Sequence, residues 1–157
     1  MVFTKSNHGV IIMIEKIIKI ITLKEEVHIL DITPNDIEVY LTEVKDSIRK
    51  NRYRIEQNSR RQDNMNLFYR YVIDETMAKD ILLGLTATDF SDILQNKHKK
   101  YEHELLYVFG KDVKLFERMG NASRLVPLYI KFNKMDDCFV IVVSLHEQKY
   151  PIKYYFK

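Results

Sequence analysis

Strand-forming residues dominate the C-terminal third of this chain. Four segments there are rich in Val, Ile, Tyr and Phe, namely residues 104–109, 125–133, 138–147 and 150–156. β-Branched and aromatic residues favour strands, and the polar segments 133–137 and 148–151 have the length of hairpin turns. The last 33 residues are therefore predicted to form an antiparallel meander, with residues 140–143 as its fully apolar central strand.

Helix signals precede these strands. Thr33 is placed to cap a helix, Pro34 suits its first position, and Asp36 lies near the positive end of the helix dipole. Apolar residues then recur at helical spacing up to about residue 50, at Ile37, Leu41, Val44 and Ile48. The sequence thus predicts an α+β fold, in which N-terminal helices pack on a C-terminal antiparallel sheet.

The middle of the chain is predicted in three pieces. Residues 51–66 have almost no aliphatic side chains, which indicates a solvated loop or an extended arm, whereas residues 67–73 (LFYRYVI) suit a strand. Residues 74–76 open a helix over 77–83, which Gly84 ends. Thr86 and Asp89 form a Thr-x-x-Asp start for a further helix to about residue 95.

An apolar stretch at residues 10–23 raises the question of a membrane segment. Charged residues at Glu15, Lys16 and Lys19 interrupt it, and a spanning helix needs about 20 predominantly apolar residues. No small-residue cleavage site follows, so we expect neither a membrane span nor export. Residues 1–30 are interpreted as an N-terminal extension of a single α+β domain over residues 31–157.

Length and composition limit the class of protein. A chain of 157 residues fills one hydrophobic core, and only four glycines and three prolines argue against a disordered or linker-rich chain. The single cysteine, Cys138, requires no oxidising compartment, so a cytoplasmic location is the default prediction. A net charge of +3 is too small to indicate a nucleic-acid partner unless the basic residues cluster.

Three stretches carry a resemblance to a known family. They are residues 81–90 (ILLGLTATDF), 128–131 (LYIK) and 140–145 (VIVVSL). In their order and spacing they resemble the MqsR family, ribosome-independent messenger-RNA interferases of bacterial toxin–antitoxin modules. The resemblance covers roughly the C-terminal half of the chain. It implies a RelE-like or barnase-like small RNase architecture, single-stranded RNA as substrate and a cognate antitoxin as protein partner.

The chain departs from that family at functional positions. Asp92 stands where the family carries a catalytic lysine, and the family's glutamine in the following strand falls on Glu104. The family's tyrosine is retained as Tyr129, whereas its lysine after the apolar strand falls on His146. An insertion between residues 107 and 125 and the N-terminal extension are further differences. These changes predict an altered, or lost, activity.

Metal-free RNA cleavage needs a base, an acid and a cation. His146 is the predicted acid or base, Tyr129 a second proton donor or phosphate contact, and Lys131 the stabiliser of developing charge. Glu104 completes the candidate catalytic set through the resemblance. Tyr129 and Lys131 are two apart and share a strand face. The plain alternative is the solvent face of an ordinary meander, with a histidine at a strand end.

Two basic segments are candidate RNA-binding surfaces. The first lies at residues 97–103, and the second, at residues 49–61, interleaves arginines with Tyr53. Such mixtures suit phosphate contacts and base stacking, although a solvated loop or an acidic protein partner would explain them equally well. The predicted RNA-binding residues are Lys97, Lys99, Lys100, His103, Arg52, Arg54, Arg60 and Arg61.

Other site chemistries find little support. The His98 and His103 pair has no metal-site spacing, and no Gly-rich phosphate loop is present, so we expect neither a metal nor a cofactor. The leading hypothesis is a toxin that cleaves single-stranded RNA. The rival is a non-catalytic nucleic-acid- or protein-binding inhibitor from a phage or mobile element. A DNA-binding regulator ranks third, because no basic recognition helix is evident.

Overall fold

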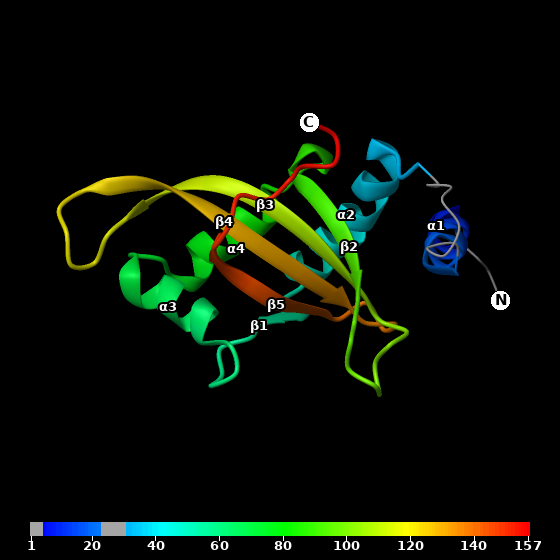
Figure 1. Cartoon of the computed structure of the whole chain (residues 1–157), viewed down its shortest axis with the longest axis horizontal. Coiled ribbons are helices and arrows are strands. Elements are labelled where there is room, and N and C mark those ends of the chain that lie inside the picture. The colour runs from blue at the N-terminus through cyan, green and yellow to red at the C-terminus, as the bar shows by residue number, and fades with distance from the viewer. Residues whose placement is uncertain (1–4, 23–30) are drawn as a thin grey trace.

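The computed structural model describes residues 5–22 and 31–157, with side chains from residue 9 to 18 and from residue 31 onward. Its helices precede most of its strands, so the predicted α+β arrangement is confirmed (Figure 1). In chain order the elements are α1 (Lys5–Thr22), α2 (Pro34–Arg49), β1 (Tyr53–Ile55), α3 (Gln62–Arg70), α4 (Glu75–Leu83), a 3-10 turn (Ala87–Asp89), β2 (Phe90–Gln95), β3 (Leu105–Phe116), β4 (Ser123–Lys134) and β5 (Val140–Glu147).

The described strands form one five-stranded sheet in the order β1-β5-β4-β3-β2. Neighbours from β5 to β2 are antiparallel, which was predicted for the segments of β4 and β5, and the short strand β1 joins the free edge of β5 in parallel. The sheet is therefore mixed. Strands β3 and β4 pair along their length, as far as Phe116 opposite Ser123, and make the long hairpin that projects at the left of Figure 1.

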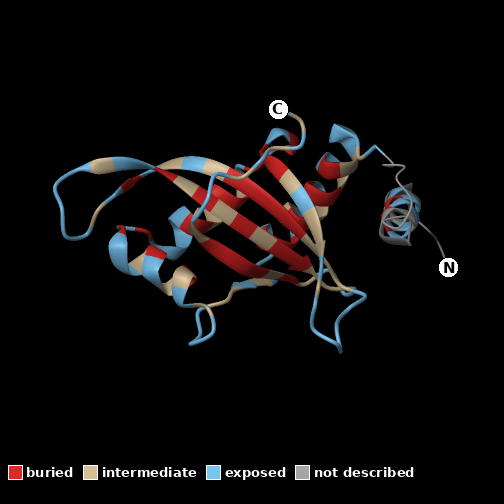
Figure 2. Cartoon of the chain, in the orientation of Figure 1, coloured by how far each residue is buried: buried red, intermediate tan, exposed pale blue. Residues whose placement is uncertain are grey.

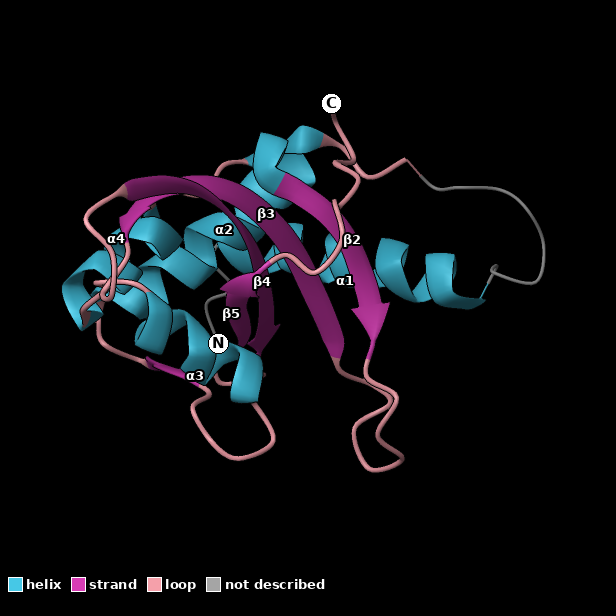
Figure 3. Cartoon of the chain, turned by 60° about the vertical axis from the view of Figure 1, so that its left-hand side comes forward, coloured by secondary structure: helices cyan, strands magenta, loops and turns pink. Residues whose placement is uncertain are grey.

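One face of the sheet packs against the helices and forms the core. Every second residue of β4, from Val126 to Phe132, is fully buried, and Figure 2 shows this alternation along the strands. Phe109 lies with its ring edge-on to both Phe132 and Phe90, with ring centroids 5.7 Å apart in each pair. Helices α2 and α4 lie behind the sheet in Figure 1 and on the same side of it in the turned view of Figure 3, and α2 supplies the apolar face that the sequence predicts.

The opposite face of the sheet, called the outer face below, carries Tyr129 and Lys131. The chain after β5 crosses this face towards β2 (Figure 1, red). The backbone N–H of Tyr155 donates to the carbonyl of Phe90 at 2.9 Å, which anchors the end of this crossing. A Cβ added to Gly110 would lie 2.2 Å from Ile152 Cδ1, so a larger residue there would displace the side chains of the crossing segment from β3.

Two predicted helix starts are confirmed. Thr33 and Asp36 exchange backbone and side-chain hydrogen bonds in a capping box at the start of α2. Asp74 accepts from the backbone N–H of Met77 at 2.8 Å and caps α4, which ends at Gly84 as predicted. Local capping chemistry therefore determines where both helices begin.

The prediction for residues 51–73 is wrong. Residues 53–55 form strand β1, and helix α3 occupies residues 62–70, where we expected first a loop and then a strand. Leu67 is buried in the core, whereas the neighbouring aromatic Tyr69 is 68% exposed. The aromatic composition of this segment thus reflects one buried stripe of a helix, which so short an apolar run does not distinguish from a strand.

Two predictions near the sheet edges are also wrong. Thr86 and Asp89 do form their capping box, but it closes only a 3-10 turn, and the chain continues as β2. Pairing of Phe90 with Phe109 places that ring in the core, and this tertiary gain overrides the local helix signal. Residues 150–156 form no strand, and they are instead the segment that crosses the outer face.

Helix α1 docks through Met13 and Ile17, which are both buried. Of the described helices, none combines the length and apolar composition that crossing a membrane requires. Residues 1–4 and 23–30 of the predicted N-terminal extension lie outside the described residues.

Replacing Phe132 with alanine is expected to lower the free energy of unfolding by about 3–5 kcal/mol, because the ring is fully buried in the middle of the sheet. Chemical denaturation monitored by circular dichroism measures the change. Met119→Ala at the tip of the β3–β4 hairpin, where the side chain is 98% exposed, is the control and should stay within about 0.5 kcal/mol of wild type. Equal losses for both variants would contradict this position of the core.

Candidate functional site

Tyr129 and His146 lie opposite each other on the outer face. They are register partners across β4 and β5, and their rings stack with centroids 5.2 Å apart and an interplanar angle of 16°. Opposed residues of an antiparallel pair project to the same side of a sheet. Folding thus brings together two of the predicted catalytic residues from segments 17 positions apart, since 146 − 129 = 17.

Lys131 extends this pair along β4. Its Nζ lies 5.9 Å from the centre of the Tyr129 ring, on the same face. Burial lowers the pKa of Lys131, and the nearby charge of Arg61 lowers it further. Burial raises the pKa of Tyr129, with a smaller contribution from the Asp92 carboxylate, so the phenol remains a proton donor at neutral pH. The predicted residues thus form a continuous polar strip across a half-buried face.

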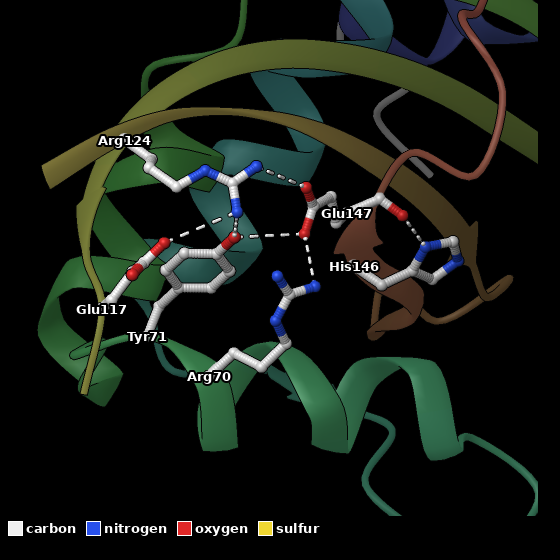
Figure 4. Close-up of polar contacts among 6 residues, drawn as sticks. All are labelled: Arg70, Tyr71, Glu117, Arg124, His146 and Glu147. Atoms are coloured by element: carbon white, nitrogen blue, oxygen red, sulfur yellow. Dashed lines mark hydrogen bonds and ion pairs between the residues drawn. The ribbon is translucent and has the colours of Figure 1, made fainter. Parts of the chain in front are cut away.

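The His146 ring is oriented by its own backbone. Its Nδ1 lies 2.9 Å from the carbonyl oxygen of Glu147 (Figure 4). Because a carbonyl oxygen only accepts hydrogen bonds, Nδ1 carries the proton of this contact. In the neutral ring Nε2 therefore holds the lone pair, which is the state that a general base requires.

The side chain of Glu147 is held by three donors from other elements. Arg70 Nη1 lies 3.0 Å, the Tyr71 hydroxyl 3.2 Å and Arg124 Nη2 3.4 Å from its carboxylate oxygens (Figure 4). Arg124 Nη1 also donates to the Tyr71 hydroxyl at 3.1 Å and lies 3.6 Å from Glu117. This network ties α3 and β4 to the end of β5, and so fixes the backbone that orients His146.

A cleft opens beside His146, between α3 and the end of β5. Its volume is about 230 Å³, and its rim carries Asp63 and Lys149, whose charged groups lie 2.8 Å apart. The Lys149 ammonium lowers the pKa of Asp63, and the carboxylate in turn raises that of Lys149. His146 therefore has one neighbour on the sheet, Tyr129, and a polar cleft on its other side.

Glu104 is not brought to this group. Its carboxylate accepts hydrogen bonds from the side chains of Asn133 and Asn96 at the start of β3. Asn133 lies four residues beyond Tyr129, which is about 13 Å along a strand. Glu104 thus sits at the far end of the outer face, where it binds asparagine amides.

The predicted RNA-binding residues divide into three places. Lys97, Lys99, Lys100 and His103 are exposed in the β2–β3 loop, which hangs below the sheet in Figure 1. Arg52 and Arg54 lie at the β1 edge, where Arg52 donates to the carbonyl of Asp137 and Arg54 pairs with Glu56 at 2.8 Å. Arg60 and Arg61 precede α3. Of the predicted RNA-binding residues, only Arg61 contributes to the lowered pKa of Lys131.

Sequence reasoning missed the network around Glu147. Its members come from residues 70–71, 117, 124 and 147, and no spacing rule connects them. The segment around Arg70 was also assigned to a strand, which hid its position at the end of a helix. Within the described residues, no three His, Cys, Asp or Glu side chains are arranged to hold a metal ion.

Comparisons with known proteins identify no relative: no protein-family model matches the chain, and neither a curated protein nor a solved structure shows significant similarity to it. The resemblance to the MqsR family, and the site roles carried over from it, remain predictions. The assignment of function below therefore depends on geometry and charge.

Tyr71→Phe is expected to lower the free energy of unfolding by about 1.5–3 kcal/mol, because it removes hydrogen bonds to the charged groups of Glu147 and Arg124. Urea denaturation at pH 7 measures the loss. Tyr69→Phe, two residues earlier on an exposed ring, is the matched control and should change little. A Tyr71→Phe variant as stable as wild type would show that the network contributes nothing to the fold.

Lys131→Met is expected to stabilise the protein at pH 7, because burial disfavours the ammonium in the folded state. The cost to wild type is complete below the lowered folded-state pKa and vanishes above the ordinary lysine value of 10.5. The advantage of Lys131→Met should therefore shrink as the pH rises towards 10.5, as measured by thermal unfolding across pH. An advantage independent of pH would exclude this explanation.

Proposed function

We propose that this protein is a metal-independent endoribonuclease that cleaves single-stranded RNA. The observation that carries the proposal is the stacked Tyr129–His146 pair, with Lys131 beside it on the same half-buried face. An imidazole, a phenol and an ammonium supply the base, donor and cation that this reaction needs.

In the proposed reaction, His146 Nε2 removes the proton from a ribose 2′-hydroxyl. The 2′-oxygen forms a bond to the adjacent phosphorus, and the bond from phosphorus to the 5′-oxygen of the next nucleotide breaks. The departing 5′-oxygen takes up a proton. The products are a 2′,3′-cyclic phosphate and a 5′-hydroxyl end, so no oxidant, metal or co-reactant is consumed.

Tyr129 and Lys131 act on the phosphate in this scheme. The raised pKa of Tyr129 keeps its hydroxyl protonated, and a phenol readily transfers a proton to the far more basic departing alkoxide. An approaching phosphate restores the favourable environment that burial removes from the Lys131 ammonium. Lys131 would thus stabilise the charge that accumulates on the phosphate oxygens in the transition state.

The cellular role that we propose with this chemistry is that of a toxin in a toxin–antitoxin module. Support comes from the resemblance of residues 81–90, 128–131 and 140–145 to the MqsR family. A cognate antitoxin would then silence the enzyme by covering its basic surface. A cytoplasmic location belongs to the same proposal.

A second candidate is a binding protein without catalysis. Asp92 favours this alternative, because it stands where the resemblance would place a lysine. Its carboxylate is close enough to Tyr129 to raise the pKa of the phenol. A negative charge near the site opposes the approach of a phosphate. Under this alternative the strip on the outer face binds nucleic acid or protein and leaves it intact.

Cleavage of a long single-stranded RNA in EDTA tests the first proposal. His146→Ala is expected to slow cleavage by about 10²–10⁴-fold, because it removes the general base. Tyr129→Phe should slow it by about 10²–10³-fold through loss of one donor to the reacting phosphate. Growth arrest on induction should disappear in the same variants.

His98→Ala, on the exposed β2–β3 loop, is the control for loss of a histidine and should cleave like wild type. Cuts that persist in His146→Ala would move the active site elsewhere. Intact RNA that binds tightly to wild type, without growth arrest, would support the binding protein instead.

A further inference from the structure

A buried asparagine fixes the first turn of α3 against β5. The side-chain amide of Asn64, a residue only 1% exposed, donates to the carbonyls of Val143 at 3.1 Å and Glu56 at 2.8 Å. Its side-chain oxygen accepts from the backbone N–H of Leu145 at 2.9 Å. Val143 and Leu145 flank Ser144 in β5, so these bonds hold the start of α3 next to Ser144.

Ser144 is the register partner of Lys131. Arg61 is the residue that directly precedes α3, three positions before Asn64, so the Asn64 contacts hold its backbone near the part of β5 that pairs with Lys131. Burial lowers the pKa of Lys131, and the positive charge of Arg61 lowers it further, which is consistent with this placement. Two half-buried cations, one from the sheet and one from the helix start, are thus held beside each other.

Neither cation is neutralised. Among the described residues, no carboxylate lies within ion-pairing distance of Arg61 or Lys131. Several other basic side chains around the sheet do have acidic partners, which are Glu147 for Arg70, Glu117 and Glu147 for Arg124, Glu43 for Lys134, Asp89 for Lys111 and Asp63 for Lys149. Like charges placed together in partial burial destabilise the folded state, unless an anion joins them.

We propose that Arg61 and Lys131 form one binding site for a phosphate group, and that this phosphate is the scissile one of the RNA. The second half of this inference rests on the proposed function, whereas anion binding does not. Lys131 Nζ lies over the Tyr129 ring, and Tyr129 stacks on His146, so a phosphate held at Lys131 lies next to both. Arg61 thereby becomes a catalytic residue that stabilises charge on the phosphate.

The chemistry of the pair selects a phosphate. A guanidinium presents a planar fork of donors that matches the two non-bridging oxygens of a phosphodiester, and an ammonium adds a compact charge beside them. A phosphodiester carries only two non-bridging oxygens, so the bridging or attacking oxygen remains for Tyr129 and His146. Binding should depend on both cations and weaken as salt rises.

Inorganic phosphate is the first probe, titrated at constant ionic strength into wild type, Arg61→Ala and Lys131→Ala. Backbone NMR shifts at Tyr129, Lys131 and His146 report the binding. Each variant is expected to bind phosphate at least 10-fold more weakly than wild type. Arg61→Lys should recover part of the affinity, because it restores the charge without the planar fork.

Lys114→Ala is the control, since it removes an exposed basic side chain of β3 that belongs neither to the candidate site nor to the predicted RNA-binding residues. Arg61→Gln provides a second variant if Arg61→Ala unfolds. Equal phosphate affinity in wild type and the folded Arg61 variants would overturn the site, as would an equal loss in Lys114→Ala.

Single-turnover cleavage of a short single-stranded RNA then tests the catalytic half. Arg61→Ala should lower the cleavage rate about 10²–10³-fold, as expected for loss of one stabiliser of transition-state charge, with partial recovery in Arg61→Lys. Phosphate binding that depends on Arg61, in a protein that never cleaves RNA, would keep the anion site and reject the nuclease. Cleavage by wild type that is unchanged in Arg61→Ala would keep the nuclease and reject this position for the scissile phosphate.

Discussion

The Asn64 side chain is the contact on which the arrangement of the site depends. An asparagine amide can donate twice and accept once or twice, and this one satisfies the carbonyls of Glu56 and Val143 and the N–H of Leu145. Leaving such buried backbone groups without partners is costly, so α3 cannot slide along β5 without losing all three bonds. The same docking places Arg61 at one end of α3 near Lys131, and Arg70 at the other end against Glu147.

At the end of β5, strand alternation places two neighbouring side chains in different surroundings. Successive residues of a strand point to opposite faces, so His146 projects to the outer face while Glu147 projects to the arginines and Tyr71. On the Glu147 side the arginines pair with carboxylates, and that network stabilises the fold. On the His146 side Lys131 stays unpaired and half-buried, which costs stability but keeps a cation available for a ligand.

The sequence predicts those parts of the molecule that depend on neighbouring residues. The Thr33 cap, the helix start at Asp74 and the shared face of Tyr129 and Lys131 all follow from neighbouring residues, and the structure adds that Asp36 completes a capping box with Thr33. The pairing of Tyr129 with His146 needs the register of β4 on β5, in which an extra residue, Val143, forms a bulge beyond Lys131. No local rule places that bulge, although it leaves the two rings on one face.

The features that the sequence did not predict depend on pairing between segments far apart in the chain. Thr86 carries a valid helix signal, yet burial of Phe90 against β3 turns the next residues into β2. Arg61 is among the predicted RNA-binding residues, but its position near Lys131 follows from the contacts of Asn64 with a strand about 80 residues away, which no local pattern shows. The polar composition of residues 51–66 predicts a solvated arm, and only the packing of α3 on β5 shows that this segment contains the start of a helix.

The position of Asp92 makes the charge on the outer face differ between its β2 side and its α3 side. Asp92 pairs with Val108 on β3, and Val108 pairs with Lys131, so the carboxylate lies two strands away from Lys131, towards β2. Arg61 directly precedes α3, which is held on β5 by Asn64, and β5 is the neighbour of Lys131 on the opposite side. An anion is repelled from the β2 side and attracted to the α3 side. If the outer face binds RNA, the phosphate therefore approaches Lys131 from α3, past Arg61, and reaches Tyr129 and His146 without crossing Asp92.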